Sequence, residues 1–149
     1  AGPAELGVWI TDRTGEGPFP RTLRLVPRSL ILGIGCRRGT PEAAIAAAAD
    51  AALAGLAPEA VAGVATIDLK KDEAGLLAFC ARRGLPLTTY SAEALAAVAG
   101  DFTPSAFVRG ITGVDNVCER AAAAAGGRII VPKQADNGVT AAVARKDTL

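Results

Sequence analysis

The sequence contains no histidine among its 149 residues. This absence excludes a Ser-His-Asp triad and a Cys-His pair, and it removes the commonest zinc ligand. Any general acid or base must then be a carboxylate, lysine, tyrosine, cysteine or bound water. Aromatic residues make up only 4% of the chain, whereas half of its residues are hydrophobic, many of them alanine. We therefore expect an aliphatic core built on tightly packed helices.

The chain also lacks a charge excess and long apolar runs. Its 16 basic residues nearly balance 15 acidic ones, for a formal net charge of +1. Nucleic-acid binders usually carry a clear basic excess, so no nucleic-acid partner is expected. No uncharged run is long enough to span a bilayer, and no signal peptide is visible at the amino end, so no membrane partner is expected either.

Paired cysteines are absent too. Cys36, Cys80 and Cys118 are widely spaced, and no C-x-x-C pair occurs. A zinc site or a thioredoxin-like motif is therefore disfavoured, and we expect neither a metal nor a cofactor. An odd number of cysteines without a secretory signal predicts a reducing, cytoplasmic location.

What the chain does contain is an alternation of apolar runs and amphipathic stretches. Strands are expected at residues 29–35, 61–69, 85–90, 128–132 and 138–145, and helices at 41–54, 72–83, 91–99 and 115–125, with a helical turn at 104–109. The alternation predicts a three-layer α/β/α domain with a mixed, mostly parallel sheet, and Asn137-Gly138 predicts a final hairpin. Residues 1–28, with short strands at 7–11 and 22–26, are expected to be a leading segment or linker, and residues 29–149 the domain.

The most informative stretch is the glycine-rich turn Gly33-Ile34-Gly35-Cys36-Arg37-Arg38-Gly39-Thr40. It lies between an apolar strand and a helix, so backbone N–H groups and the positive end of the helix should face an anion. Its spacing differs from the dinucleotide fingerprint and the P-loop, which disfavours a nucleotide. A purely structural turn is the alternative. The candidate substrate-binding residues here are Gly33, Gly35, Arg37, Arg38, Gly39 and Thr40, and Thr40 is also the expected cap of the following helix.

Cys36 differs from the other two cysteines. It stands beside two arginines before a helix, a setting that should lower the pKa of an exposed thiol. A nucleophile is one interpretation, and a small residue packed in the turn is the alternative that we favour. Cys80 and Cys118 fall on inward helix stripes and are expected in the core.

A second group follows the strand at 61–69. Asp68, Lys70 and Glu73 come where that strand ends, and parallel strands present their carboxyl ends at one edge of a sheet. A carboxylate there could activate water, and a lysine could bind a substrate carboxylate. A charged loop with Asp72 as helix cap is the alternative. Lys133 reaches the same edge if its strand runs parallel.

Together these residues define two sets of candidates. The candidate catalytic residues are Asp68, Glu73 and Cys36. The cations are expected to form a rim that suits a ligand with several carboxylates or phosphates, and they are Arg37, Arg38, Lys70 and Lys133.

These motifs resemble the carboxyl-terminal domain of the CbiG/CobE family of cobalamin biosynthesis. The resemblance covers about residues 29–145. It includes Ser91-Ala92-Glu93-Ala94-Leu95, Gly113-Val114 through Val117 with Glu119, and the ending Val131-Pro132-Lys133 followed by residues 138–145. The first strand resembles the end of the preceding region in longer CbiG proteins, as expected for a piece cut from a fusion. The family's motif positions are carried over to Gly33, Gly35, Cys36, Gly39, Thr40, Asp68, Lys70, Glu73 and Lys133.

The resemblance implies a domain that acts on a corrin-ring intermediate, whose acetate and propionate carboxylates suit the cationic rim. One implied role is that of cobalt-precorrin-5A hydrolase, which opens the ring lactone and releases acetaldehyde. Water activated by Glu73 or Asp68 would attack the carbonyl, and backbone N–H groups near Gly35–Gly39 would hold the oxyanion. The alternative is a non-catalytic binder or carrier of a precorrin or hydrogenobyrinic acid intermediate, as in CobE. Other corrin-pathway enzymes or a fused domain are the implied protein partners.

Overall fold

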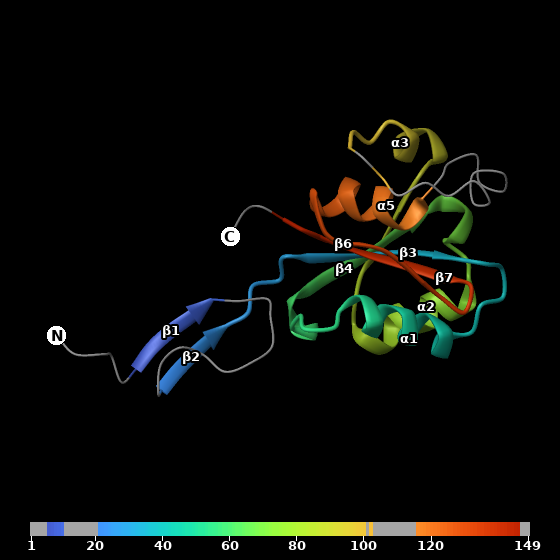
Figure 1. The fold of residues 1–149 in the computed structure, drawn as a ribbon. Helices are drawn as coiled ribbons and strands as arrows, with labels where there is room; N and C mark the ends of the chain where they lie inside the picture. Colours follow the sequence, from blue (N-terminus) through green and yellow to red (C-terminus); the bar gives the residue numbers. More distant parts are fainter. Residues whose placement is uncertain (1–5, 11–20, 101, 103–115, 147–149) are drawn as a thin grey trace.

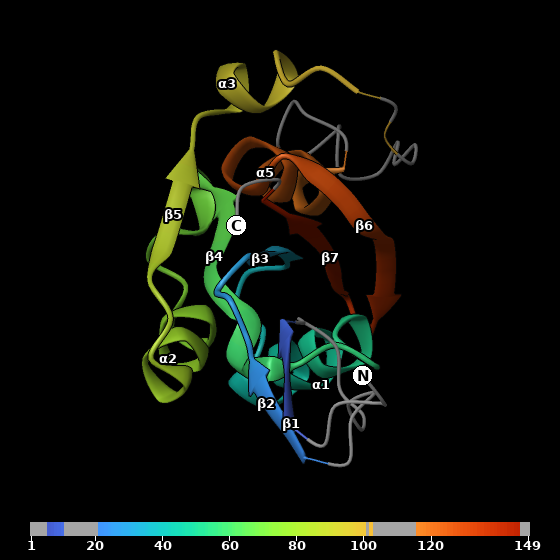
Figure 2. The same cartoon turned by 90° about the vertical axis from the view of Figure 1, so that its left-hand side faces the viewer.

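The computed structural model describes residues 6–10, 21–100, 102 and 116–146, and the first two strands only through their backbone. Its main sheet has five strands in the order β5-β4-β3-β7-β6 (Figure 2). Strands β3, β4 and β5 are parallel, and β7 runs antiparallel to β3 and β6. The predicted mixed sheet is therefore confirmed. The strands are β3 (Leu30–Cys36), β4 (Val61–Ile67), β5 (Leu87–Tyr90), β6 (Arg128–Asp136) and β7 (Val139–Arg145).

Helices cover both faces of this sheet, which confirms the three-layer prediction (Figure 1). One face carries α1 (Glu42–Ala52) and α2 (Ala74–Arg83), and the other carries α5 (Val117–Gly126) and α3 (Ala92–Ala96). Two short 3₁₀ turns, η1 (Pro58–Ala60) and η2 (Asp68–Lys70), flank β4. The helical turn predicted at 104–109 lies outside the described residues.

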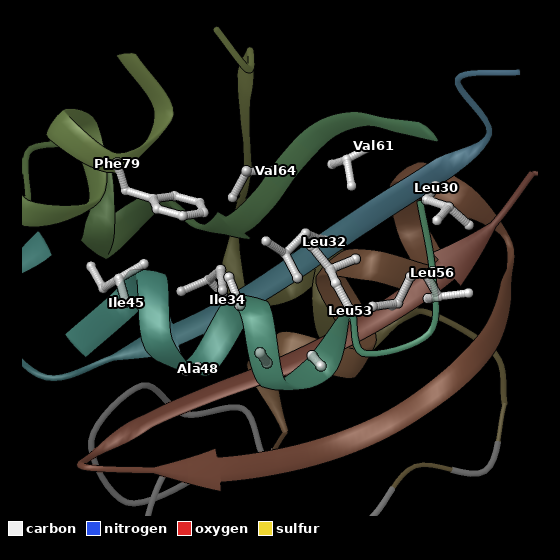
Figure 3. Close-up of a cluster of buried hydrophobic side chains, with 14 of the residues drawn as sticks. Leu30, Leu32, Ile34, Ile45, Ala48, Leu53, Leu56, Val61, Val64 and Phe79 are labelled. Carbon is white, nitrogen blue, oxygen red and sulfur yellow. The ribbon is translucent and has the colours of Figure 1, made fainter. Parts of the chain in front are cut away.

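The core is aliphatic, as the composition predicts, and it follows the alternation of β3. Leu32 and Ile34 pack with Ile45 of α1 and with Phe79 of α2 (Figure 3). Ile31, the residue before Leu32, points to the opposite face of the strand and packs on the α5 side. Burial of each such aliphatic side chain contributes about 1.5–3 kcal/mol, so the sheet is stabilised from both sides.

Local signals place several helix ends correctly. Ser91 caps α3, because its Oγ accepts the N–H of Ala94 at 3.0 Å. Gly84 ends α2 in the left-handed conformation, with φ at 65°, as expected for glycine at this position. Asn137 and Gly138 both adopt positive φ in the two-residue turn between β6 and β7. The predicted hairpin is thus confirmed.

Other local expectations are wrong. Thr40 does not cap α1, because its hydroxyl donates to the carbonyl of Arg37 at 2.6 Å. Helix α2 begins at Ala74 with Glu73 as its cap residue, rather than at Asp72, because η2 takes up the residues directly after β4.

The leading strands lie apart from the main sheet. β1 (Leu6–Ile10) and β2 (Arg21–Leu25) pair with each other in parallel, in a separate two-stranded sheet (Figures 1 and 2). Both strands match the expected ranges at 7–11 and 22–26 closely. Within the described part of the chain, the five-stranded sheet begins only at Leu30. A domain boundary near residue 28 stays a prediction.

Helix α5 lies directly on the backbone of β3. A Cβ atom at Gly33 would come within 1.9 Å of the carbonyl oxygen of Cys118 and 2.9 Å of the Cβ of Ala122. Only glycine permits this approach, because a methyl group would overlap the helix backbone. Gly33 is buried there, so the structure gives it a packing role rather than a place at the surface.

Replacement of Gly33 by alanine is expected to destabilise the fold strongly. Overpacking typically costs about 1–3 kcal/mol, and a clash with backbone places Gly33→Ala at the upper end of that range. The matched control is Gly39→Ala, whose added Cβ meets nothing within 4 Å but sits at φ +76°. That strain alone costs about 1–2 kcal/mol. Urea unfolding measures both losses, and an equal loss in the two variants would contradict the close approach.

Candidate functional site

The candidate residues gather at the carboxyl edge of the sheet. β3, β4 and β6 run in the same direction, so the turn after β3, the η2 turn and the β6–β7 hairpin leave the sheet at one edge. Figure 1 shows the turn after β3 and the hairpin together on the right-hand side. The condition stated for Lys133, that its strand run parallel to β3 and β4, is therefore met. Within that edge the alternation of β3 divides the side chains between two faces.

On the face of α1 and α2, the turn is clamped to α2. The Oε2 atom of Glu73 accepts the N–H of Gly39 at 3.0 Å. A Cβ atom at Gly75 would lie 2.1 Å from the carbonyl oxygen of Thr40 and 3.1 Å from the nitrogen of Glu42, so the start of α2 covers the start of α1. The anion that this turn holds is therefore a carboxylate of the protein itself.

This clamp changes the predicted anion site. The N–H of Gly39 donates to Glu73, and the N–H of Thr40 donates to the carbonyl of Arg37 at 3.2 Å. The N–H of Gly39, which was expected to help hold an oxyanion, therefore already has an acceptor within the protein. Its release for a ligand would require Glu73 to move.

Cys36 lies half-buried against the core of the α1 and α2 face. Burial raises the pKa of its thiol above the ordinary value of 9.0, Lys70 lowers it to a smaller extent, and Glu73 raises it. The predicted lowering was conditional on an exposed thiol, and that condition is not met, because loss of water around the half-buried thiolate outweighs the nearby cation. The alternative interpretation of Cys36, a small residue packed in the turn, agrees with its surroundings.

Cys80 and Cys118 are confirmed as core residues, exposed by 5% and 0%. Burial raises the pKa of Cys80 to about 11. Burial also raises the pKa of Cys118 to about 12, opposed by a hydrogen bond with Thr140 and by the charge of Lys133. Lys133 and Thr140 are therefore both neighbours of Cys118 on the α5 face.

Packing on the α5 face also explains why residue 35 is a glycine. The hydroxyl of Thr140 donates to the carbonyl of Gly35 at 3.4 Å, and a Cβ atom at Gly35 would lie only 2.5 Å from that hydroxyl oxygen. The strand therefore needs glycine here to accommodate the neighbouring threonine. Like Gly33, Gly35 has a packing role.

The start of α5 is a buried polar cluster. Asn116 is 1% exposed and adopts the left-handed conformation, with φ at 51° and ψ at 58°. Asparagine tolerates this conformation better than most residues. Its Oδ1 accepts the N–H of Glu119 at 3.2 Å and the thiol of Cys118 at 3.3 Å. The first turn of the helix is thus capped by a side chain within the protein.

Glu119 is the functional candidate that sequence reasoning missed. It is 2% exposed, and its Oε2 accepts the backbone N–H of Lys133 at 2.6 Å. Helical periodicity does not reveal its burial, because at 100° per residue Glu119 lies well away from the centre of the inward stripe formed by Val117, Cys118, Ala121 and Ala122. Its burial depends on contacts with β6, and a carboxylate buried in this way needs hydrogen bonds in place of the lost water.

The remaining candidates lie at the exposed rim. Arg37 and Arg38 are exposed in the turn, and Asp68 is exposed at the start of η2. The Arg37 side chain reaches the β6–β7 hairpin, since its Cδ lies 3.8 Å from where a Cβ of Gly138 would be. The structure thus groups Cys36, Lys70 and Glu73 on one face, places Lys133 on the other, and brings the Arg37 side chain against the turn of the β6–β7 hairpin.

The described residues contain neither a candidate metal-binding group nor a helix that could cross a membrane. No group of three or more histidine, cysteine, aspartate or glutamate residues in those ranges could hold a metal ion. No helix among them has the length and apolar character needed to cross a membrane.

Comparison with known proteins identifies the family. The family model described as "Cobalamin synthesis G C-terminus" matches residues 30–144. The chain belongs to the CbiG/CobE family of cobalamin-biosynthesis proteins. The resemblance predicted from the sequence motifs is therefore confirmed, and the matched range begins with β3.

Two relatives represent the two branches of the CbiG/CobE family. The chain is 38% identical over 111 residues to cobalt-precorrin-5A hydrolase of Salmonella typhimurium, and the match covers 72% of this chain but only 31% of the hydrolase. It is also 38% identical over 129 residues to protein CobE of Sinorhizobium sp, covering 80% of this chain and 82% of CobE. The chain thus spans less than a third of the hydrolase and most of CobE.

Solved structures agree with this assignment. The crystal structure of CobE, a protein from the cobalamin (vitamin B12) biosynthetic pathway, superposes with a TM-score of 0.71 at 30% identity, covering 78% of this chain and 89% of CobE. The cobalamin biosynthesis protein chiG of Agrobacterium tumefaciens str. C58 gives a TM-score of 0.60 at 32% identity, covering 80% and 99%. The α/β/α fold is therefore shared with these two cobalamin-biosynthesis proteins.

The thiol of Cys36 is expected to react slowly with iodoacetamide at neutral pH, with a titration midpoint above the ordinary 9.0. Peptide mapping across pH 7–10 measures this midpoint for Cys36 separately from the two core cysteines. Glu73→Gln should lower the midpoint and Lys70→Gln should raise it, because the carboxylate disfavours the thiolate and the ammonium favours it. A midpoint well below 9 in the unmodified protein would restore the activated nucleophile.

Proposed function

We propose that this domain binds an anionic corrin-ring intermediate of cobalamin biosynthesis at the carboxyl edge of its sheet. One observation carries the proposal: β3, β4 and β6 run to the same edge. Arg37 and Arg38 follow β3 there and Lys70 follows β4, whereas Lys133 lies within β6, three residues before its end at Asp136. Such intermediates carry acetate and propionate carboxylates, and lysine and arginine are the residues that pair with carboxylates. The proposed contacts are Arg37, Arg38, Lys70 and Lys133.

Of the two roles implied by the CbiG/CobE family, the structure favours a binder or carrier. The Glu73 carboxylate and the Gly39 N–H, proposed as base and oxyanion donor, are hydrogen-bonded to each other. The raised pKa of Cys36, caused chiefly by burial, opposes a nucleophilic thiol.

Lactone opening is the second candidate, and its support is the 38% identity to cobalt-precorrin-5A hydrolase. Asp68 is exposed at the carboxyl edge and would serve as the base that activates water. The activated water would attack the lactone carbonyl, the tetrahedral intermediate would collapse to open the ring, and carbon–carbon cleavage would then release acetaldehyde. In this role Glu73 would first have to leave Gly39.

Removal of one cation at the edge is expected to weaken ligand binding. Titration with hydrogenobyrinic acid, followed by its visible bands at low ionic strength, should show micromolar binding, and Lys70→Gln should raise Kd about 3- to 10-fold. Lys146→Gln is the matched control, since Lys146 lies beyond the opposite end of β3, where its N–H bonds Ser29. Absence of binding, or equal effects of the two variants, would contradict the proposed site.

The carrier role and the hydrolase role give different products. Incubation of the purified chain with cobalt-precorrin-5A should shift the visible spectrum without release of acetaldehyde, which a coupled alcohol dehydrogenase assay detects. Acetaldehyde formed at a rate that Asp68→Asn abolishes would instead establish the hydrolase role. Lys71→Gln, a variant of an exposed residue near the same turn, controls for a general loss of charge.

A further inference from the structure

The carboxylate of Glu119, buried in the first turn of α5, needs hydrogen-bond donors around it. Glu119 is 2% exposed, and it lies between Cys118 and Ala121, each 0% exposed. Desolvation of an acidic side chain is costly unless hydrogen bonds replace the lost water. The backbone N–H of Lys133 supplies such a bond at 2.6 Å, across 14 residues of sequence. Glu119 therefore ties the helix to one specific point of β6.

That point is a break in the β6–β7 ladder. Val131 pairs with Val143 and Gln134 with Ala141, so Pro132 and Lys133 together oppose a single residue. This is a β-bulge, a feature that re-aims a side chain within a strand. Proline has no N–H to donate, and the N–H of Lys133 goes to Glu119 instead of to the ladder. The local orientation of Lys133 thus depends on the helix.

The backbone of Glu119 is also fixed, by a hydrogen bond with Asn116. Its own N–H donates to the Oδ1 of Asn116 at 3.2 Å, in the capped first turn of α5. The close packing of α5 on Gly33 fixes the helix against the sheet. A rigid chain of contacts therefore runs from β3 through α5 to the bulge at Lys133.

We propose that Glu119 is a positioning residue, which fixes the bulge so that the Lys133 ammonium meets a carboxylate of the corrin intermediate. This proposal rests on the proposed function. Glu119 would not touch the ligand, because it is buried, and it would act through the backbone of Lys133. The length of the Glu119 side chain, which we call its reach, then matters more than its charge. The N–H of Lys133 needs an acceptor oxygen at the position that this side chain reaches.

Two conservative variants separate reach from charge. Glu119→Gln keeps an oxygen at the same reach but removes the charge, whereas Glu119→Asp keeps the charge but withdraws the oxygen by one methylene. In the hydrogenobyrinic acid titration, Glu119→Asp and Lys133→Ala should each raise Kd about 3- to 10-fold, and Glu119→Gln should stay within about twofold of the unmodified protein. Urea unfolding of each variant confirms that a folded protein is titrated.

The double variant tests the path of action. In a Lys133→Ala background, Glu119→Asp should cause no further loss of affinity, because the ammonium that it positions is already gone. A loss that adds in full, or an equal loss in Glu119→Gln and Glu119→Asp, would overturn the positioning role. An unaffected Lys133→Ala with a weakened Lys70→Gln would overturn it too, yet leave the proposed function standing. Absence of binding by the unmodified protein would instead remove the proposed function itself.

Discussion

The close approach of α5 to β3 is the constraint on which the rest of the structure depends. Gly33 lets the helix backbone rest on the strand backbone, with the carbonyl of Cys118 where a side chain would otherwise be. Gly126 repeats the approach at the other end of α5, where an added Cβ would lie 2.9 Å from that of Ala144. Both ends of α5 therefore pack closely against the sheet. This packing positions the polar first turn of the helix near the carboxyl edge of the sheet. Asn116 and Glu119 can be buried there because packing, rather than solvent, surrounds them.

The fold was largely predictable because its signals are local. The inward stripe of α1, the cap at Ser91 and the Asn137-Gly138 turn each depend on residues within a few positions of one another. Strand order is different, since nothing local distinguishes an edge strand from a central one. The insertion of β7 between β3 and β6, and the separate parallel pairing of β1 with β2, arise from contacts between distant segments. The start of α2 was predicted too early, at residue 72, because the sequence did not reveal the 3₁₀ turn η2 that follows β4.

The candidate site was predictable in its location and not in its contacts. Parallel strands ending in Cys36 and Ile67 bring the two charged turns to one edge, which topology alone predicts. The bond from Gly39 to Glu73 spans 34 residues, and nothing in the turn indicates that its donor is already taken. The pKa of Cys36 likewise depends chiefly on burial, a property of the tertiary structure. The burial of Glu119 also depends on a contact between separate segments, its bond with the backbone N–H of Lys133 on β6.

The central place of β7 has a consequence for how the chain comes to be folded. β3 pairs with β7 along seven residues, from Leu30 with Arg145 to Cys36 with Val139, although more than 100 positions separate the two strands. β6 contacts the sheet only through β7. A nascent chain on the ribosome therefore cannot close its hydrophobic core until this strand has left the exit tunnel. Until then β3 presents an open edge, and closure of the core has the slow kinetics of long-range strand pairing.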